Sequence, residues 1–131
     1  MDATGERPSA ASTTRADKRR AVLVLQTNPL TLSSFRRCLS RHFEAVHVAH
    51  SPEDAERALA LGANPTHVVC GHDLGENKPN GSTLIARWRR QYASIERAIL
   101  ATGAEVEARA GGPIDAVFRK PSSPKELLAL L

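Results

Sequence analysis

Five short apolar segments alternate with segments of helical periodicity along residues 21–131, and this alternation constrains the fold more than any other feature. Strands are expected at about 21–26, 45–49, 67–71, 98–101 and 116–118, and helices at about 29–42, 52–61, 82–92, 104–110 and 124–131. Short buried strands joined by helical connections form parallel sheets that are covered on both faces. Right-handed crossovers then predict a doubly wound α/β sandwich.

Length and composition indicate one globular domain behind a tail. A chain of 131 residues with 41% apolar and 24% charged residues can bury a core without disulfides or metal. Residues 1–20 hold almost no large apolar side chains, so we expect a disordered tail there and a folded domain at 21–131. We expect no membrane insertion and a cytoplasmic protein, since the sequence shows neither a membrane-spanning segment nor a signal peptide.

The formal charge of +4 does not by itself indicate nucleic-acid binding. Residues 1–20 hold five basic and three acidic side chains, so half of the net charge lies in the tail. Domains that bind nucleic acid carry a concentrated basic stripe, and the sequence shows none. Arg87, Arg89 and Arg90 are expected on the solvated face of a helix. Nucleic acid is therefore not an expected partner; a binder acting through the tail would show steep salt dependence.

The first strand ends in a neutral segment, Gln26-Thr27-Asn28-Pro29. In open parallel sheets, ligands collect beyond the carboxyl ends of the strands, so these residues lie where chemistry is expected. Asn28 and Pro29 are suited to cap the next helix and to occupy its first position. Gln26 and Thr27 offer only neutral oxygens to a ligand.

Three motifs resemble the receiver domains of bacterial two-component response regulators, the CheY-like superfamily. Val22 to Pro29 is similar to the first strand and the acidic pair that follows it, and Ile99 to Gly103 to the fourth strand with its switch hydroxyl. Phe118-Arg119-Lys120-Pro121, followed by Ser-Pro-Lys-Glu-Leu-Leu, is similar to the fifth strand, its Lys-Pro pair and the final helix. The resemblance covers residues 21–131. It implies a flavodoxin-like (βα)5 fold with strand order 2-1-3-4-5 and a signalling module without enzyme activity.

The resemblance also implies a chemistry that this chain keeps only in part. In receivers, an Asp at the end of the third strand accepts a phosphoryl group from a kinase, Mg²⁺ is held by carboxylates, and a Lys and a hydroxyl bind the phosphoryl oxygens. Lys120 and Thr102 match the last two positions, whereas the acidic pair falls on Gln26 and Thr27. We therefore expect weak or absent Mg²⁺ binding, no metal site and no other cofactor.

The position of the phosphoacceptor has two interpretations. Counting forward along the third strand places Gly71 there, with a following loop about two residues longer than usual. Counting back from Gly81 without a gap places Asp73 there instead. We favour Gly71, because that register keeps the strand length, and Asp73 stays the candidate phosphoacceptor of the alternative.

The remaining candidate residues have ordinary interpretations. Cys38 and Cys70 lack a CxxC spacing and are expected as small buried side chains in a reducing cytosol. His67 and His72 are expected as strand and loop histidines that do not converge on a metal. Lys120 is expected as a structural relic that pairs with Asp73 or with backbone carbonyls, against the alternative of retained anion binding.

The predicted output face also departs from the family pattern. The segment between Thr102 and Lys120 is short, so the helix expected at 104–110 is truncated. The position of the aromatic residue that often reports switching falls on Val117, and Phe118 is expected to point to the other face of the sheet. These departures put the switch and the usual dimer surface in doubt.

Our leading interpretation is a degenerate receiver, or pseudo-receiver, that serves bacterial signalling as a protein-interaction module without phosphorylation. The alternative is a working two-component phosphoacceptor that uses Asp73 in a phosphorelay. The expected partner is a signalling protein, either a histidine kinase or a downstream effector, and a homodimer is left open.

Overall fold

The structure is a computed structural model, and it describes residues 20–102, 112–119 and 124–131. Three predictions fall outside these residues: the tail at 1–20, apart from Arg20, the helix at 104–110, and the surroundings of Lys120.

Five parallel strands form one sheet in the order β2-β1-β3-β4-β5. They span Ala21–Leu25 (β1), Ala45–Ala49 (β2), His67–Gly71 (β3), Arg97–Thr102 (β4) and Ala116–Arg119 (β5). Every residue of β1 and β3 is buried, as expected for the central strands of a sheet that is covered on both sides. The predicted flavodoxin-like strand order is confirmed.

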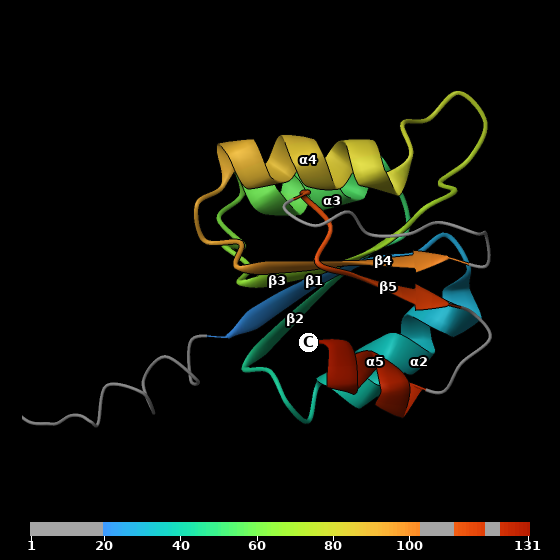
Figure 1. Cartoon of the computed structure of the whole chain (residues 1–131), viewed down its shortest axis with the longest axis vertical. Coiled ribbons are helices and arrows are strands. Elements are labelled where there is room, and N and C mark those ends of the chain that lie inside the picture. The colour runs from blue at the N-terminus through green and yellow to red at the C-terminus, as the bar shows by residue number, and fades with distance from the viewer. Residues whose placement is uncertain (1–19, 103–111, 120–123) are drawn as a thin grey trace, which may run out of the picture.

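Helices cover both faces of this sheet (Figure 1). They span Pro29–Leu39 (α2), Pro52–Ala60 (α3), Gly81–Gln91 (α4) and Pro124–Leu130 (α5). In Figure 1, α3 and α4 lie on one side of the sheet, and α2 and α5 lie on the other. The sheet and helices together make the predicted doubly wound sandwich.

The helices begin where polar caps satisfy their first N–H groups. The Asn28 side-chain oxygen accepts hydrogen bonds from the N–H groups of Leu30 and Thr31 at 2.9 and 3.0 Å, which confirms Asn28 as the predicted cap of α2. Ser51 and Asn80 cap α3 and α4 in the same manner.

The prediction that the first helix extends to about residue 42 is wrong, because α2 ends at Leu39. The hydroxyl of Ser40 donates a hydrogen bond to the Arg36 carbonyl, and the N–H groups of His42 and Phe43 donate to the Leu39 carbonyl. These bonds close the last turn and redirect the chain toward β2.

The two faces of the sheet bury separate cores. The core under α2 and α5 contains Phe35, Leu39 and Leu127 from the helix layer and Phe118 from β5. The core under α3 and α4 contains Leu84 and the fully buried Trp88, among others. Val117 packs against this second core, so Val117 and Phe118 face opposite sides of the sheet, as predicted.

The arginines are distributed differently from the sequence-based expectation. On α4, Arg87 forms an ion pair with Glu56 at 2.8 Å and Arg89 with Asp115 at 2.6 Å, so only Arg90 of the three keeps the solvated role that was predicted. On the other side of the sheet, α2 carries two exposed arginines, Arg36 and Arg37, and no acidic residue.

Candidate functional site

The candidate site lies at the carboxyl ends of β1, β3 and β4. Gln26 follows β1 directly, is 2% exposed, and donates its backbone N–H to the Ala49 carbonyl at 3.1 Å. Thr27 is exposed and leads to Asn28, the cap of α2. The side chain at the tip of β1 is therefore a buried amide.

Gly71 is the last residue of β3 and lies beside Gln26. Leu25 and Cys70 are partners in the β1–β3 register, so the next residues along the two strands are neighbours. A Cβ atom built on Gly71 would lie 3.4 Å from Nε2 of Gln26. A side chain at position 71 would thus extend from β3 toward the side chain that follows β1.

Asp73 lies beyond β3 in the loop that leads to α4. It is exposed, and one of its carboxylate oxygens accepts a hydrogen bond from the Gly75 N–H at 3.3 Å. Gly75 has a φ of +120°, so this local turn needs the freedom of glycine. Lys78 in the same loop pairs with Glu53 of α3 at 2.5 Å. The observed role of the Asp73 carboxylate is to support its own turn.

Thr102 ends β4 and is 5% exposed. Gly71 pairs with Ala101 in the β3–β4 register, which places Thr102 at the same edge of the sheet as Gly71 and Gln26. The structure therefore brings together three of the predicted site residues: Gln26, Gly71 and Thr102. Thr27 and Asp73 lie at the rim as exposed residues, and Lys120 lies outside the described residues.

His72 has a feature that its sequence interpretation as an ordinary loop histidine missed. Its Nδ1 atom is buried and forms no hydrogen bond within the described ranges, while its carbonyl accepts the Gly81 N–H at 2.9 Å. A buried polar atom without a hydrogen bond lowers the stability of the folded state. The sequence does not indicate that this nitrogen is buried, because many ordinary loop residues also follow an apolar strand directly. His67 begins β3 and His72 follows its end, so the two rings do not form a shared site.

The residues at this edge do not fit a magnesium ion. Mg²⁺ prefers carboxylate oxygens and gives up water reluctantly, whereas Gln26, Thr27 and Gly71 offer an amide, a hydroxyl and no side chain. Throughout the described ranges, no group of three or more His, Cys, Asp or Glu side chains is placed to hold a metal ion.

Comparisons with known proteins agree with this architecture. No model of a protein family matches the chain, and no curated protein matches it significantly. Among solved structures, the signal receiver domain of an HD domain-containing protein from Pseudomonas fluorescens Pf-5 superposes with a TM-score of 0.72. It is 26% identical, and the match covers 86% of this chain and 90% of that chain. The chain has the fold of response regulator receiver domains.

Two other receiver structures illustrate the range of these neighbours. A response regulator from Burkholderia pseudomallei, solved with a phosphorylated aspartic acid, a calcium ion and citrate, has a TM-score of 0.71 and 27% identity over 86% of this chain and 66% of that chain. A CheY-like receiver domain protein from Methanospirillum hungatei JF-1 has a TM-score of 0.70 and 17% identity over 84% and 88%. This receiver-like chain thus keeps the fold while its sequence has diverged.

No helix in the described part of this receiver-like chain is long and apolar enough to span a membrane.

Proposed function

We propose that this receiver-like chain is a pseudo-receiver, which acts in bacterial signal transduction by binding another protein and without being phosphorylated. The observation that supports this most directly is Gly71, which ends β3 beside Gln26 where a phosphoacceptor carboxylate would extend toward the tip of β1. A glycine has no nucleophile to offer.

The chemistry of phosphoryl transfer supports the same conclusion. Transfer to a carboxylate depends on positioning the nucleophile and on neutralising charge on the transferring group, which divalent cations normally do. The edge formed by Gln26, Gly71 and Thr102 lacks both the nucleophile and the anionic ligands for a cation. Binding of another protein at an exposed helix or sheet face needs neither a nucleophile nor a cation.

We further propose that the receiver-like domain comprises residues 21–131 and that it works in the cytoplasm. Its partner would be a signalling protein, either a histidine kinase or a downstream effector. Nucleic acid and metal cofactors have no part in this proposal.

The test treats the full chain, in the presence of Mg²⁺, with acetyl phosphate followed by intact-mass measurement and, separately, with beryllofluoride followed by amide NMR. We expect no added phosphoryl mass and no saturable shift at Gln26, His72 or Thr102. Saturable shifts at these amides with beryllofluoride, or added phosphoryl mass with acetyl phosphate, would overturn the proposal.

The second candidate function is a phosphoacceptor receiver that uses Asp73 in a phosphorelay. The observation in its favour is that Asp73 is exposed and only two residues beyond the end of β3. If the wild type becomes labelled, the Asp73→Asn variant decides between acceptors: loss of labelling assigns it to Asp73, and unchanged labelling rejects this second function.

A further inference from the structure

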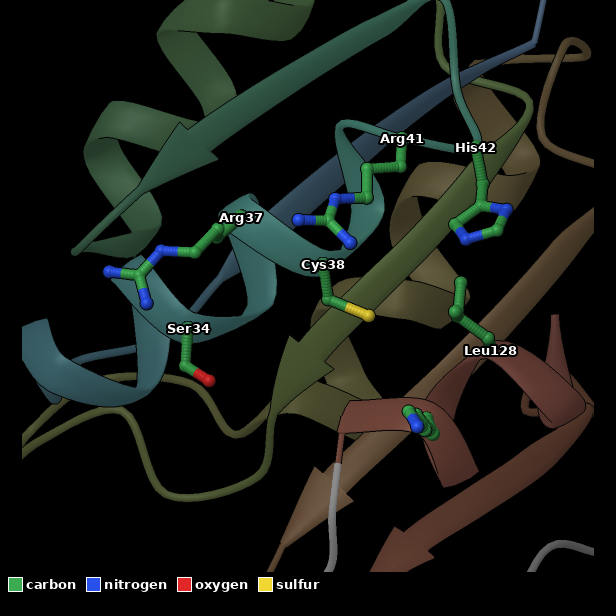
Figure 2. Close-up of a pocket in the computed structure, with 7 residues that line it drawn as sticks. Ser34, Arg37, Cys38, Arg41, His42 and Leu128 are labelled. Carbon is green, nitrogen blue, oxygen red and sulfur yellow. The ribbon is translucent and has the colours of Figure 1, made fainter.

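A hollow of about 550 Å³ lies between α2 and α5, on the side of the sheet opposite α3 and α4. Figure 2 shows Cys38 and His42 on one side of this hollow and Leu128 on the other. We call it the α2–α5 groove and define it by its lining: Ser34, Arg37, Cys38, Arg41, His42, Lys125 and Leu128. It is separate from the edge formed by Gln26, Gly71 and Thr102.

The charged groups in the lining of the α2–α5 groove are all basic. Arg37 lies in the last turn of α2 and Arg41 in the turn that follows it; both are exposed and extend their guanidinium groups to the same side in Figure 2. Lys125 is exposed on the other helix, and His42 is exposed where the chain leaves α2. Among the described residues, no carboxylate contributes to the lining, so these residues give the groove a net positive charge.

Most arginines on the opposite side of the sheet, by contrast, have acidic partners. Arg57, Arg87 and Arg89, all on α3 and α4, form ion pairs with acidic side chains. Within the part of the chain that the structure describes, Arg37, Arg41 and Lys125 form no ion pair. Arginines near the end of a helix complement the helix dipole, but this does not account for Lys125, which comes from the first turn of a different helix.

The floor of the groove is apolar. Cys38 and Leu128 are half-buried, and the aliphatic stems of arginine and lysine side chains add apolar surface beneath their charged ends. The volume lies within the range of small-molecule sites. Guanidinium groups bind phosphate oxygens in pairs of parallel hydrogen bonds, which makes them the preferred ligands of phosphate groups.

We propose that the α2–α5 groove binds a small ligand of the nucleotide class, with its phosphate groups at Arg37, Arg41 and Lys125 and its flat apolar part against Cys38 and Leu128. The positive charge accounts for the phosphates, and the apolar floor accounts for the ring system. This site is independent of phosphoryl transfer at the sheet edge, so it stands or falls apart from the pseudo-receiver proposal.

The test uses ATP as the probe, with the full chain in EDTA and low salt, and follows amide shifts by NMR. We expect saturable shifts at Ser34, Cys38 and Leu128 and none at Gln26 or Thr102. The Arg37→Gln/Arg41→Gln variant should bind at least tenfold more weakly, because each lost charge-assisted hydrogen bond corresponds to roughly a factor of ten.

A matched control removes the same charge from the other side of the sheet. Arg57→Gln/Arg90→Gln changes two exposed arginines on α3 and α4 and should leave ATP affinity unchanged. Equal weakening by both double variants would show a general charge effect and would overturn the proposal. Equal affinity for tripolyphosphate and ATP would do the same, since an adventitious anion makes no use of the apolar floor.

The thiol of Cys38 provides a second readout that needs no substitution. Cys38 lines the groove, whereas Cys70 is fully buried in the sheet. Bound ATP should slow alkylation of Cys38 by neutral iodoacetamide at least several-fold at saturation. Unchanged alkylation at saturating ATP, or displacement of ATP by an equal concentration of a short DNA duplex, would exclude a dedicated nucleotide site.

Discussion

Gly81 lies so close to Gly71 that a Cβ atom at position 81 would be 2.0 Å from the Gly71 carbonyl oxygen. The same Cβ would lie 2.8 Å from Cδ1 of Leu100. The N–H of Gly81 meanwhile donates to the His72 carbonyl at 2.9 Å. The first turn of α4 is thereby held directly against the end of β3, and only a residue without a side chain permits this approach.

The first prediction follows from this contact. The new methyl group of Gly81→Ala would collide with backbone atoms, which cannot move aside as a flexible side chain can. We therefore expect the variant to lower the free energy of unfolding by about 3 kcal/mol, the upper end of the usual cost of overpacking. Urea denaturation measures the change. Gly71→Ala is the control, since its Cβ would meet its nearest atoms at 3.4 Å, and it should cost far less. Equal destabilisation by both variants would contradict the close approach of α4 to β3.

The second prediction concerns the missing metal ligands. The variant Gln26→Asp/Thr27→Asp/Gly71→Asp places three carboxylates at the ends of β1 and β3, where hard cations are bound in proteins. At a Mg²⁺ concentration ten times its Kd, the metal should stabilise this variant by about 1.4 kcal/mol, because binding to the folded state alone adds to stability. Thermal unfolding with and without Mg²⁺ measures this gain.

The wild type and the neutral variant Gln26→Asn/Thr27→Asn/Gly71→Asn are the controls for the metal test. Neither should respond to Mg²⁺ beyond the effect of added salt. A wild type that is stabilised by Mg²⁺ as strongly as the triple aspartate variant would show that a site exists without these carboxylates.

The third prediction concerns Asp115, whose carboxylate accepts hydrogen bonds from Ala98 of β4 and Arg89 of α4. Burial acts to raise the pKa of Asp115, but hydrogen bonds from the Ala98 N–H and from Arg89, with the charge of Arg89, outweigh it and hold the pKa below the ordinary value of 3.8. The ionised carboxylate therefore stabilises the fold above pH 3.8, and this contribution is lost as the pH falls through the lowered pKa.

Asp115→Asn should accordingly cost about 1–2 kcal/mol at neutral pH and progressively less in acid. Denaturant unfolding at several pH values measures this dependence. Glu53→Gln, which disrupts an exposed pair with Lys78, should show a much smaller effect and is the control. A cost for Asp115→Asn that stays constant down to pH 2 would mean that the charge does not contribute.

The sequence was sufficient for the sheet because each central strand is a complete apolar run. Such a run must be buried on both sides, as it is at Val22 to Leu25 and at Val68 to Cys70. The polar caps Asn28 and Ser51 mark where helices start. The end of α2 was not predictable from periodicity, because the hydrogen bonds of Ser40 ended the helix while the apolar pattern continued.

The sequence predicted which strand ends form the site, but it did not decide which residue lies at the end of β3. Counting along the sequence allows either Gly71 or Asp73 at the end of the strand, depending on where the loop is longer than usual. In the structure, the pairing of Leu25 with Cys70 places Gly71 beside Gln26. The α2–α5 groove was not predictable at all. Its charge depends on Arg37 and Lys125, which are far apart in the sequence and line the same groove only in the folded domain, and no local sequence pattern indicates this.

The last prediction concerns His67, which begins β3. Its ring packs edge-on against Phe43 with the centroids 5.1 Å apart, and its Nδ1 lies 2.8 Å from the hydroxyl oxygen of Thr66. Burial lowers the pKa of His67 below 6.5, and the positive charges of Arg20 and Arg97 lower it further against the opposing effect of Glu96. The folded state therefore favours the neutral ring. Between pH 6.5 and the lowered pKa, the unfolded chain binds more protons than the folded one, so stability falls as the pH is lowered through this window.

His67→Gln cannot take up this proton and should flatten the dependence of the unfolding midpoint on pH between about 7 and 5, the range in which an ordinary histidine titrates. His42→Gln, which changes an exposed histidine, should leave that dependence as it is in the wild type. Urea midpoints measured across this range for the three proteins provide the comparison. If the His67→Gln protein loses stability toward pH 5 as steeply as the wild type, the acid sensitivity arises from other groups and the buried, neutral state of His67 is not its cause.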